Sequence, residues 1–431
     1  MWLIFMGGAA TLRAAPLPHC NRRGGCAPAS PPARSLSPPT MHRALRRSLG
    51  VITLALTLAP RGGAAFQGVR GASPPPASPT PPRREATRRI DSLAHAFVRG
   101  GQSPGVTVAV VRAGRDTLLL RGYGLADVEN DVPATAQTVY RVGSVTKQFT
   151  AAAVMRFVER GRLSLDDTLG ALLPGLPAAW RPVRVRQLLN HTSGIPSYTD
   201  VGARWLRRST EDMPPDSLLA FVAGDTMDFA PGTSWHYDNT GYVLLGMLLE
   251  RLGGRTYAEL LDAELFQPLA LPTIRYCHTE PIVPHRAHGY ARDGDRLVNA
   301  PYLSMSQPFG AGVLCATAGD LARWNRLLAT GRVVGQPSYS SMTTPEGAAR
   351  AAPVHYGYAL IVDTLGGHRM ITHGGAINGF MSANAYFPDD ELSVTVLANQ
   401  APAPTDALLR EIARAALGMP ASAVGAGTRA H

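Results

Sequence analysis

The first patterned stretch of the chain predicts a helix followed by two strands. Residues 84–99 place apolar side chains at helical spacing, at Ile90, Leu93, Ala94 and Phe97. The runs 106–114 and 116–126 that follow are rich in Val and Leu and are separated by a short turn. Two apolar runs arranged in this way are typical of adjacent antiparallel strands.

Helical spacing dominates the middle of the chain, and strand patterns return near its end. From Ser144 to about residue 330, helical stretches alternate with Pro- and Gly-containing loops. Strand patterns fill much of residues 355–400, and residues 405–418 predict a last helix. The order predicts an α/β fold: one antiparallel sheet built from both chain ends, flanked by helices, with a mostly helical region inserted at about 150–330. A site is expected where the sheet and the insertion meet.

The amino-terminal part of the chain differs in composition from the rest. Residues 1–82 contain nine arginines and no acidic residue, so the formal net charge of +11 falls to +2 for the remaining residues. A nearly neutral body offers no basic face for nucleic acid. From Met41, a basic segment, a 12-residue apolar run and small residues up to Ala65 predict a secretory signal peptide. The alternative is an uncleaved signal anchor, which would be the only attachment to a membrane.

These features divide the chain into three parts. Residues 1–65 are interpreted as an upstream segment and signal peptide, 66–83 as a Pro-rich linker, and 84–431 as one folded domain. The predicted location is secreted or periplasmic. Cys277 and Cys315 lie in the exported part, where they could pair or remain buried free thiols.

A single lysine is the first candidate for chemistry. The chain has 42 basic residues, and Lys147 is the only one that is not arginine. Arginine stays protonated in proteins, whereas a desolvated lysine can lose its proton and act as a base. Ser144 lies three residues earlier, at the predicted start of a helix and on the same helical face. Helix capping would explain the serine but not the lysine, so the pair indicates a serine nucleophile with a lysine base.

Two later stretches supply polar partners. Tyr237 stands just before an apolar helical run, where a tyrosine beside an ammonium can have a lowered pKa and shuttle protons. Asn239 can orient both the lysine and a substrate amide, although Asp238 or Asn239 could instead cap the helix. His373 ends a predicted strand, and the two glycines after it would let a substrate backbone approach the strand edge. The alternative for these glycines is a hairpin turn.

In their order along the chain, these three motifs resemble those of a known enzyme family. Ser-Val-Thr-Lys at 144–147, Tyr-Asp-Asn at 237–239 and His-Gly-Gly at 373–375 are similar to the motifs of the penicillin-recognising serine hydrolases. The chain looks most like the branch that holds class C β-lactamases, D-Ala-D-Ala carboxypeptidases, D-aminopeptidases and related esterases, over about residues 88–400. The resemblance implies a β-lactamase/transpeptidase-like fold and an acyl-enzyme mechanism that needs no metal or organic cofactor.

The resemblance also implies roles for the motif residues. Ser144 would be the acylated nucleophile, Lys147 its base and Tyr237 a second proton shuttle. Asn239 would orient the lysine and the substrate. The backbone N–H groups of Ser144 and Ala376 would form an oxyanion hole.

The third motif departs from the class C pattern. Class C β-lactamases usually have lysine where this chain has His373, and histidine is similar to what some carboxypeptidases and D-aminopeptidases carry. With an unperturbed pKa of about 6.5, His373 would hold a partial, pH-dependent charge at the substrate-binding edge, beside Gly375 and Ala376. The resemblance therefore implies an exported hydrolase that cleaves an ester or amide in a small-molecule or peptide substrate. A class C-type β-lactamase and a sensor that acylates without turnover are the alternatives.

Two other patterns carry less weight. Gly-Gln-Ser-Pro-Gly at 101–105 matches a nucleophile elbow, but a helix precedes it and a strand follows, so Ser103 is interpreted as part of a turn. Four potential metal ligands fall within twelve residues, and their spacing fits no standard zinc site, so no metal is expected. They are Cys277, His278, His285 and His288.

Overall fold

The structure, a computed structural model, describes residues 81–112 and 116–422. The signal peptide and nearly all of the linker predicted for residues 1–83 lie outside the described residues and remain predictions. None of the described helices has both the length and the apolar character that crossing a bilayer requires.

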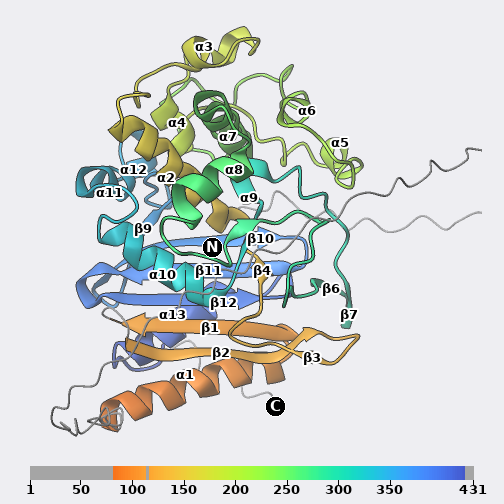
Figure 1. The fold of residues 1–431 in the computed structure, drawn as a ribbon, viewed down its shortest axis with the longest axis vertical. Coiled ribbons are helices and arrows are strands. Elements are labelled where there is room, and N and C mark those ends of the chain that lie inside the picture. Colours follow the sequence, from red (N-terminus) through yellow and green to blue (C-terminus); the bar gives the residue numbers. More distant parts are fainter. Residues whose placement is uncertain (1–80, 113–115, 423–431) are drawn as a thin grey trace, which may run out of the picture. The chain divides into compact units, whose positions relative to one another are not determined.

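One antiparallel sheet joins the two ends of the domain (Figure 1). Its seven strands lie in the order β3-β2-β1-β12-β11-β10-β9. Strand β1 pairs with β2 on one side and with β12 on the other, in a register that runs from Val106 opposite Ala398 to Arg112 opposite Leu392. The predicted sheet from both chain ends is therefore confirmed. The strands are β1 (Gly105–Arg112), β2 (Asp116–Asp127), β3 (Val132–Pro133), β9 (Ile361–Leu365), β10 (His368–Ile377), β11 (Phe380–Phe387) and β12 (Leu392–Ala398).

Helices α1 and α13 cover one face of this sheet, and α10 packs on the other face together with the inserted region (Figure 1). Because both faces are covered, all seven residues of β12 are buried, which explains its nearly continuous apolar sequence. Three of the four apolar positions that predicted the first helix lie in the core between the sheet and helices α1 and α13. They are Ile90, Ala94 and Phe97. The fourth, Leu93, is partly buried.

The inserted region holds most of the remaining helices. A second core, with Phe149, Trp180 and Tyr242 among its fully buried members, fills the space between these helices and the sheet. The α-helices are α1 (Pro81–Arg99), α2 (Thr146–Glu159), α3 (Leu169–Leu172), α4 (Val185–Leu189), α5 (Ala203–Leu206), α6 (Pro215–Leu219), α7 (Asn239–Gly253), α8 (Tyr257–Leu261), α9 (Phe309–Gly312), α10 (Ala318–Ala329), α11 (Gln336–Met342), α12 (Ala348–Ala351) and α13 (Thr405–Ala416). There are also three 3-10 turns, η2 (Gly143–Val145), η3 (Ala178–Trp180) and η5 (Pro388–Asp390), and one π-helical turn, η4 (Asp262–Phe266), among the described residues.

Two small sheets interrupt the region that the sequence predicts as mostly helical. Their strands are two to four residues long, too short to produce a recognisable alternation of polar and apolar residues. They are β4 (Tyr140–Arg141), β5 (Arg275–Tyr276) and β8 (Leu314–Ala316) in one sheet, and β6 (Tyr290–Asp293) and β7 (Arg296–Asn299) in the other. Cys277 and Cys315, next to and within the first of these sheets, are both buried free thiols.

Candidate active site

Ser144 lies in the tight turn η2 between β4 and α2. Gly143, directly before it, has φ of +51°, a backbone conformation that favours glycine and lets the chain turn sharply from strand into helix. The backbone N–H of Leu314 donates to Thr146 Oγ1 over 3.0 Å and ties the start of α2 to β8. Ser144 therefore lies in a fixed position near the positive end of α2, as its place before a helix predicts.

Lys147 is fully buried one turn further along, with 0% of its surface exposed. Its Nζ lies 3.2 Å from Ser144 Oγ, 2.8 Å from Asn239 Oδ1 and 2.9 Å from the carbonyl oxygen of Ala311. The amide and carbonyl oxygens can only accept, so they take two N–H groups of the amine. A neutral amine has two N–H groups and one lone pair, and the lone pair is then left for the Ser144 hydroxyl proton.

The surroundings of Lys147 favour this neutral form. Burial holds the pKa of Lys147 well below its usual range, and the nearby Asp238 carboxyl opposes the shift only in part. The rings of Tyr237 and Tyr242, with centroids 4.7 Å and 5.3 Å from Nζ, are close neighbours of the amine. A desolvated lysine of this kind is suited to accept a proton at neutral pH.

A hydrogen bond fixes the orientation of the Asn239 amide. Its Nδ2 donates to Thr199 Oγ1 over 2.9 Å, so its Oδ1 must point toward Lys147. The backbone N–H of Asn239 donates to Ser197 Oγ over 3.1 Å. The cap of α7 is Asp238, whose side chain accepts from the backbone N–H of Gly241, so Asn239 is left available for Lys147.

Tyr237 is half-buried and its side chain is hydrogen-bonded to Ser144. Burial raises the pKa of Tyr237, and the hydrogen bond to Ser144 lowers it by less. The lowered pKa expected from the sequence is therefore wrong. An uncharged Lys147 supplies no full positive charge to stabilise a phenolate, and the desolvated ring favours the neutral phenol. Tyr237 can still donate its hydroxyl proton toward an atom bound at Ser144.

His191 supports the ring of Tyr237 from within the inserted region. It is buried, and its ring centroid lies 4.3 Å from that of Tyr237 and 5.3 Å from that of Tyr242. Its Nδ1 accepts from the backbone N–H of Asp238 over 3.1 Å, so this nitrogen carries no proton. Burial holds the pKa of His191 well below its usual range. Sequence reasoning did not single out this histidine.

The backbone of Ser144 lies directly against strand β10. A Cβ atom on Gly143 would lie 2.9 Å from both the backbone nitrogen and the backbone oxygen of Ala376. A Cβ atom on Gly375 would lie 2.9 Å from the backbone nitrogen of Ser144 and only 2.0 Å from the carbonyl oxygen of Val142. The two glycines thus permit an approach that brings the backbone of Ser144 beside that of Ala376, the arrangement an oxyanion hole requires.

Strand β10 extends past its edge neighbour at this point. The pairing of β10 with β9 ends at Thr372, opposite Ile361, whereas the pairing with β11 continues to Ile377. Residues 373–377 therefore pair with β11 on one side but not with β9 on the other, and they lie next to η2. An extended substrate backbone can pair with such an edge.

His373, at the start of this edge, is buried rather than presented to solvent, with 1% of its surface exposed. Its Nδ1 lies 2.6 Å from the carbonyl oxygen of Gly374, and its Nε2 lies 2.8 Å from the hydroxyl of Tyr356. Burial, with a further contribution from Lys147, lowers the pKa of His373 to about 3. The partial charge near neutral pH that the sequence predicts is therefore wrong.

Several residues that complete the site carry no sequence signal of their own. Ala311 acts through its backbone oxygen, and Thr199 and Tyr356 act through single hydroxyl groups in loops. Ser382 on β11 donates to the carbonyl oxygen of Val142 over 2.8 Å and secures the turn before Ser144. These contacts depend on the folded chain and belong to no short motif.

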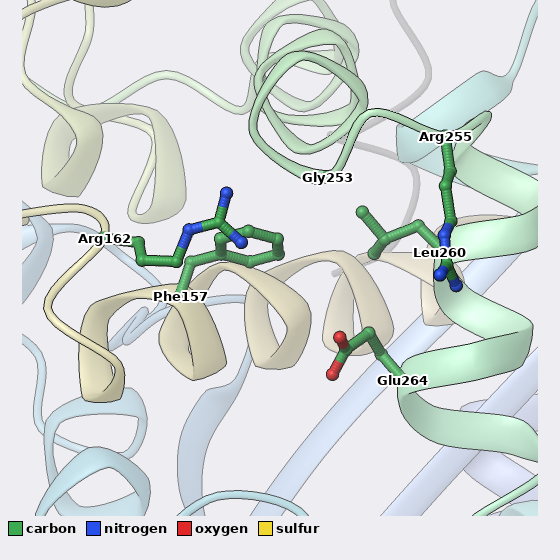
Figure 2. Close-up of a pocket in the computed structure, with 6 residues that line it drawn as sticks. All are labelled: Phe157, Arg162, Gly253, Arg255, Leu260 and Glu264. Carbon is green, nitrogen blue, oxygen red and sulfur yellow. The ribbon is translucent and has the colours of Figure 1, made fainter.

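Three other features lie outside the site. Ser103 is buried in the turn between α1 and β1 and donates to the carbonyl oxygen of Gly105 over 2.8 Å. A cavity of about 190 Å³ lies at the carboxyl end of α2 (Figure 2). This end is roughly 20 Å along the helix from Ser144. The cavity is lined by Phe157, Arg162, Gly253, Arg255, Leu260 and Glu264.

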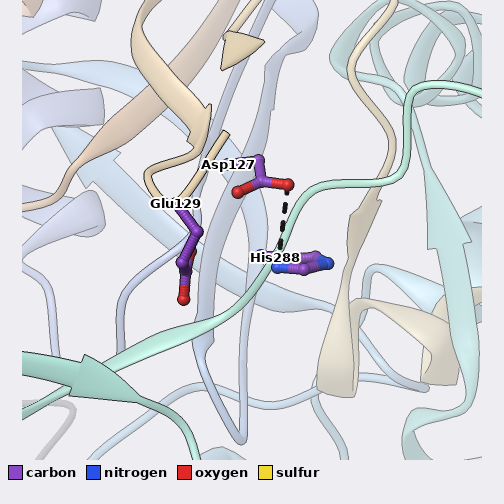
Figure 3. Close-up of side chains that lie close together, drawn as sticks. All are labelled: Asp127, Glu129 and His288. Carbon is purple, nitrogen blue, oxygen red and sulfur yellow. Dashed lines mark ion pairs between the residues drawn. The ribbon is translucent and has the colours of Figure 1, made fainter. Parts of the chain in front are cut away.

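The third feature is a cluster of possible metal ligands on the surface. In the described part of the chain, ligand atoms of Asp127, Glu129 and His288 lie within 4.8 Å of one another (Figure 3). Glu129 accepts a hydrogen bond from the Tyr290 hydroxyl, and Asp127 accepts from Asn130 Nδ2 over 2.8 Å. Hydrogen bonds within the protein therefore explain why these side chains lie together. Of the ligands that the sequence analysis considered, only His288 belongs to it.

Comparisons with known proteins agree with this geometry. The β-lactamase family profile matches residues 90–418. The D-aminopeptidase of Brucella canis is 30% identical over 332 residues, and the match covers 77% of this chain and 63% of the relative. The D-aminopeptidase of Brucella ovis is 29% identical over 337 residues, with the same coverage. This chain thus spans less than two thirds of the length of these relatives.

Solved structures show the same fold. A D-stereospecific amidohydrolase from Streptomyces sp. has a TM-score of 0.68 and 29% identity, covering 78% of this chain and 99% of its own. An octameric penicillin-binding protein homologue from Pyrococcus abyssi has a TM-score of 0.67 and 28% identity, covering 77% of each chain. The sequence-based assignment to the penicillin-recognising hydrolases, with their sheet-and-helix fold, is confirmed. The chain belongs to the β-lactamase family of serine hydrolases.

Proposed function

We propose that the protein hydrolyses an amide or ester bond next to a D-amino acid through an acyl-enzyme on Ser144. The observation that carries the proposal is the buried Lys147 amine, 3.2 Å from Ser144 Oγ, with two acceptors for its own N–H groups. Nothing in a purely structural role requires a lysine to be desolvated beside a serine.

Acylation follows from this arrangement. Lys147 takes the hydroxyl proton as Ser144 Oγ forms a bond to the substrate carbonyl carbon. The backbone N–H groups of Ser144 and Ala376 stabilise the charge that develops on the carbonyl oxygen. As the bond to the leaving group breaks, the Tyr237 hydroxyl donates its proton to the leaving nitrogen or oxygen and recovers one from Lys147. The products of this half-reaction are a Ser144 ester and a free amine or alcohol.

Deacylation uses the same groups in reverse. Water takes the place of the departed leaving group, and the Lys147 amine, with Tyr237, accepts its proton as the water oxygen attacks the ester carbonyl. The Ser144 oxygen regains a proton and the carboxylic acid leaves. All proton transfers are supplied by side chains of the chain itself, and no cofactor takes part in the proposed sequence.

The choice of substrate rests on the relatives and on the third motif. The curated relatives are D-aminopeptidases, and one similar solved structure is a D-stereospecific amidohydrolase. His373 supplies no positive charge near neutral pH, which argues against an enzyme that binds its substrates through a carboxylate. A D-amino-acid amide, a short peptide with an amino-terminal D-residue or an ester therefore fits better than a β-lactam.

The test is a substrate panel on the protein that starts at residue 66. The panel contains D- and L-alanine p-nitroanilide, a short-chain nitrophenyl ester and a chromogenic cephalosporin. We expect multiple turnovers with the D-anilide and the ester, and little with the L-anilide or the cephalosporin. A single burst followed by no turnover would instead indicate a sensor, and faster cephalosporin hydrolysis would indicate a β-lactamase.

A covalent probe identifies the nucleophile. A fluorophosphonate should add a mass to the peptide that contains Ser144, and Ser144→Ala should remove both labelling and turnover. Ser103→Ala is the matched control, because Ser103 is the serine of the other motif and should leave labelling intact. An adduct on Ser103 would overturn the assignment.

We further propose that the enzyme acts outside the cytoplasm. The support is the signal peptide pattern up to Ala65 and the linker that follows it. A nearly neutral folded domain supports a small-molecule or peptide substrate and not nucleic acid. Mass spectrometry of the mature protein from the secreting host tests this, because a new amino terminus near residue 66 is expected. An intact amino terminus in the membrane fraction would indicate an uncleaved anchor instead.

A further inference from the structure

The third motif is held by a tyrosine that the mechanism above does not use. The hydroxyl of Tyr356 lies 2.8 Å from Nε2 of His373, and the other ring nitrogen, Nδ1, lies 2.6 Å from the carbonyl oxygen of Gly374. Both residues are buried, each with 1% of its surface exposed. His373 therefore has a protein partner at each ring nitrogen.

These contacts define one protonation state of the ring. A carbonyl oxygen only accepts, so Nδ1 must carry the proton that is donated to Gly374. In a neutral imidazole the other nitrogen is then an acceptor, and Tyr356 must be its donor. The alternative, an imidazolium that donates from both nitrogens, would place a full positive charge on a ring with 1% of its surface exposed. Burial is the main cause of the lowered pKa of His373, and it disfavours that form.

Tyr356 itself is firmly placed. It lies between α12 and β9, forms an isolated bridge with Ile361, and packs in a small apolar cluster with Val354 and Ile361. Its ring meets that of His373 edge to face at a centroid distance of 5.7 Å, and that of Tyr237 at 6.3 Å. The ring of Tyr237 also lies 6.3 Å from that of His373. The titratable groups around His373 include Tyr356 and Tyr237 and, through electrostatic effects, Lys147 and His191.

We propose that Tyr356 is a positioning residue that holds His373 as its neutral Nδ1–H tautomer, and that this makes the edge of β10 select substrates without a carboxylate. A ring with both nitrogens engaged offers a carboxylate neither a positive charge nor an unused N–H. The inference rests on the proposed function, because it names the substrates within that class: amides, esters and blocked peptides rather than peptides whose free carboxylate would lie at this edge.

The state of the ring can be measured without turnover. Nitrogen-15 NMR of histidine-labelled protein distinguishes protonated from unprotonated ring nitrogens, and the His373 signals are assigned by comparison with His373→Gln. We expect a proton on Nδ1, none on Nε2, and no titration between pH 5 and 8. A proton on Nε2, or a titration in this range, would overturn the proposal, whatever the enzyme hydrolyses.

Selectivity is tested with two substrates that share one scissile bond. D-Ala-D-Ala and D-Ala-D-alaninamide differ only in the terminal carboxylate. We expect kcat/KM to be at least about tenfold higher for the amide, the scale of leaving a charged group without a partner. Equal values, or a preference for the free acid, would count against selection by the third motif. Failure with both peptides and with simple esters would instead reject the proposed function.

Tyr356→Phe separates positioning from packing, because it keeps the ring and removes the donor to His373. In this variant Nε2 can take a proton more easily, so the preference for the amide should shrink by about threefold to tenfold at pH 6, the scale of one hydrogen bond. The matched control is Tyr358→Phe, which removes a buried hydroxyl two residues away that donates to Glu346. It should keep the wild-type preference. An unchanged preference in folded Tyr356→Phe would overturn the role of Tyr356, and the NMR measurement on the wild type decides the tautomer if that variant does not fold.

Discussion

The side-chain oxygen of Asn239 lies 2.8 Å from Nζ of Lys147 and receives one of its N–H groups. The side-chain amide of Asn239 cannot flip without losing the hydrogen bond from its own Nδ2 to Thr199 Oγ1. The Ala311 carbonyl oxygen accepts the second N–H group. The lone pair of the neutral amine is then the group that faces Ser144 Oγ. The proposed base is thus oriented by its neighbours before any substrate binds, which would lower the reorganisation that catalysis needs.

The first prediction uses the fact that Lys147 is the only lysine of the chain. Protein labelled with carbon-13 at lysine Cε gives one lysine side-chain signal, so its titration reports Lys147 directly. We expect a midpoint well below the usual value of about 10.4, because burial favours the neutral amine. Asn239→Asp should raise the midpoint, since it places a carboxylate beside Nζ. A wild-type midpoint near 10.4 would contradict a neutral base.

The second prediction is that Lys147→Arg is inactive. Arginine keeps a positive charge at this position but cannot release its proton, and its side chain is larger than the fully buried lysine that it replaces. We expect a loss of at least about a hundredfold in kcat/KM for a nitrophenyl ester, the usual effect of removing a general base. Lys147→Met, which is uncharged and also lacks the base, should lose as much activity with less structural disturbance. Activity within about threefold of wild type in either variant would show that the lysine is not the base.

Sequence patterns predicted the parts of the fold that are long or strongly periodic. Helix α1, the β1–β2 pair and the carboxyl-terminal strands follow their apolar patterns, because each buries a continuous face against a large core. The short strands β5 and β8 were not predicted, since two or three residues carry no period. Their pairing is set by the tertiary contacts that hold the turn before Ser144.

The candidate site divides in the same way. Ser144, Lys147, Tyr237 and Asn239 were recognisable because their residue types have specific chemistry at a specific spacing, and the structure brings them together. Their protonation was not predictable, because the pKa depends on burial, which a sequence does not show. His373 illustrates the difference: it was predicted to end a strand, whereas β10 continues through Gly374 and Gly375 to Ile377, and its burial reversed the expected charge.

The third prediction concerns the close approach of β10 to Ser144. Gly375→Ala adds a Cβ atom 2.0 Å from the carbonyl oxygen of Val142 and 2.6 Å from Ser382 Oγ, so the backbone must move. We expect a loss of about 1–3 kcal/mol in the free energy of unfolding, the scale of overpacking. Activity should fall by about a hundredfold, because the oxyanion donors of Ser144 and Ala376 are displaced.

Urea unfolding and ester hydrolysis measure both effects of this substitution. Gly224→Ala is the matched control, because a Cβ atom there meets nothing within 4 Å and Gly224 has no positive φ. The control should retain both stability and activity. If Gly375→Ala also retains both, the backbone of Ser144 does not need this contact.

The last prediction is a dependence of stability on pH that involves His373. Its folded-state pKa of about 3 lies below the unfolded value of about 6.5, so the folded protein binds fewer protons between these values. Stability from this residue is therefore complete above about pH 6.5 and is lost as the pH falls toward 3, with a slope of up to about 1.4 kcal/mol per pH unit. His191, which is also buried with a lowered pKa, adds a loss of the same sign. Asp238, whose pKa burial raises to about 7, acts in the opposite direction, because it is protonated more readily in the folded state.

The contribution of His373 is isolated by comparing variants. His373→Gln cannot titrate, so its free energy of unfolding, measured in urea from pH 7 to pH 4.5, should fall less steeply than that of the wild type. Asp238 is present in both proteins and cancels in the difference. His191 is also present in both, and only the smaller part of its pKa lowering that comes from His373 changes. His355→Gln replaces an exposed histidine and measures the effect of the substitution itself. Parallel curves for the wild type and His373→Gln would mean that the ring binds protons equally in the folded and unfolded states, so that folding does not lower its pKa. Both the neutral third motif and the role assigned to Tyr356 would then be wrong.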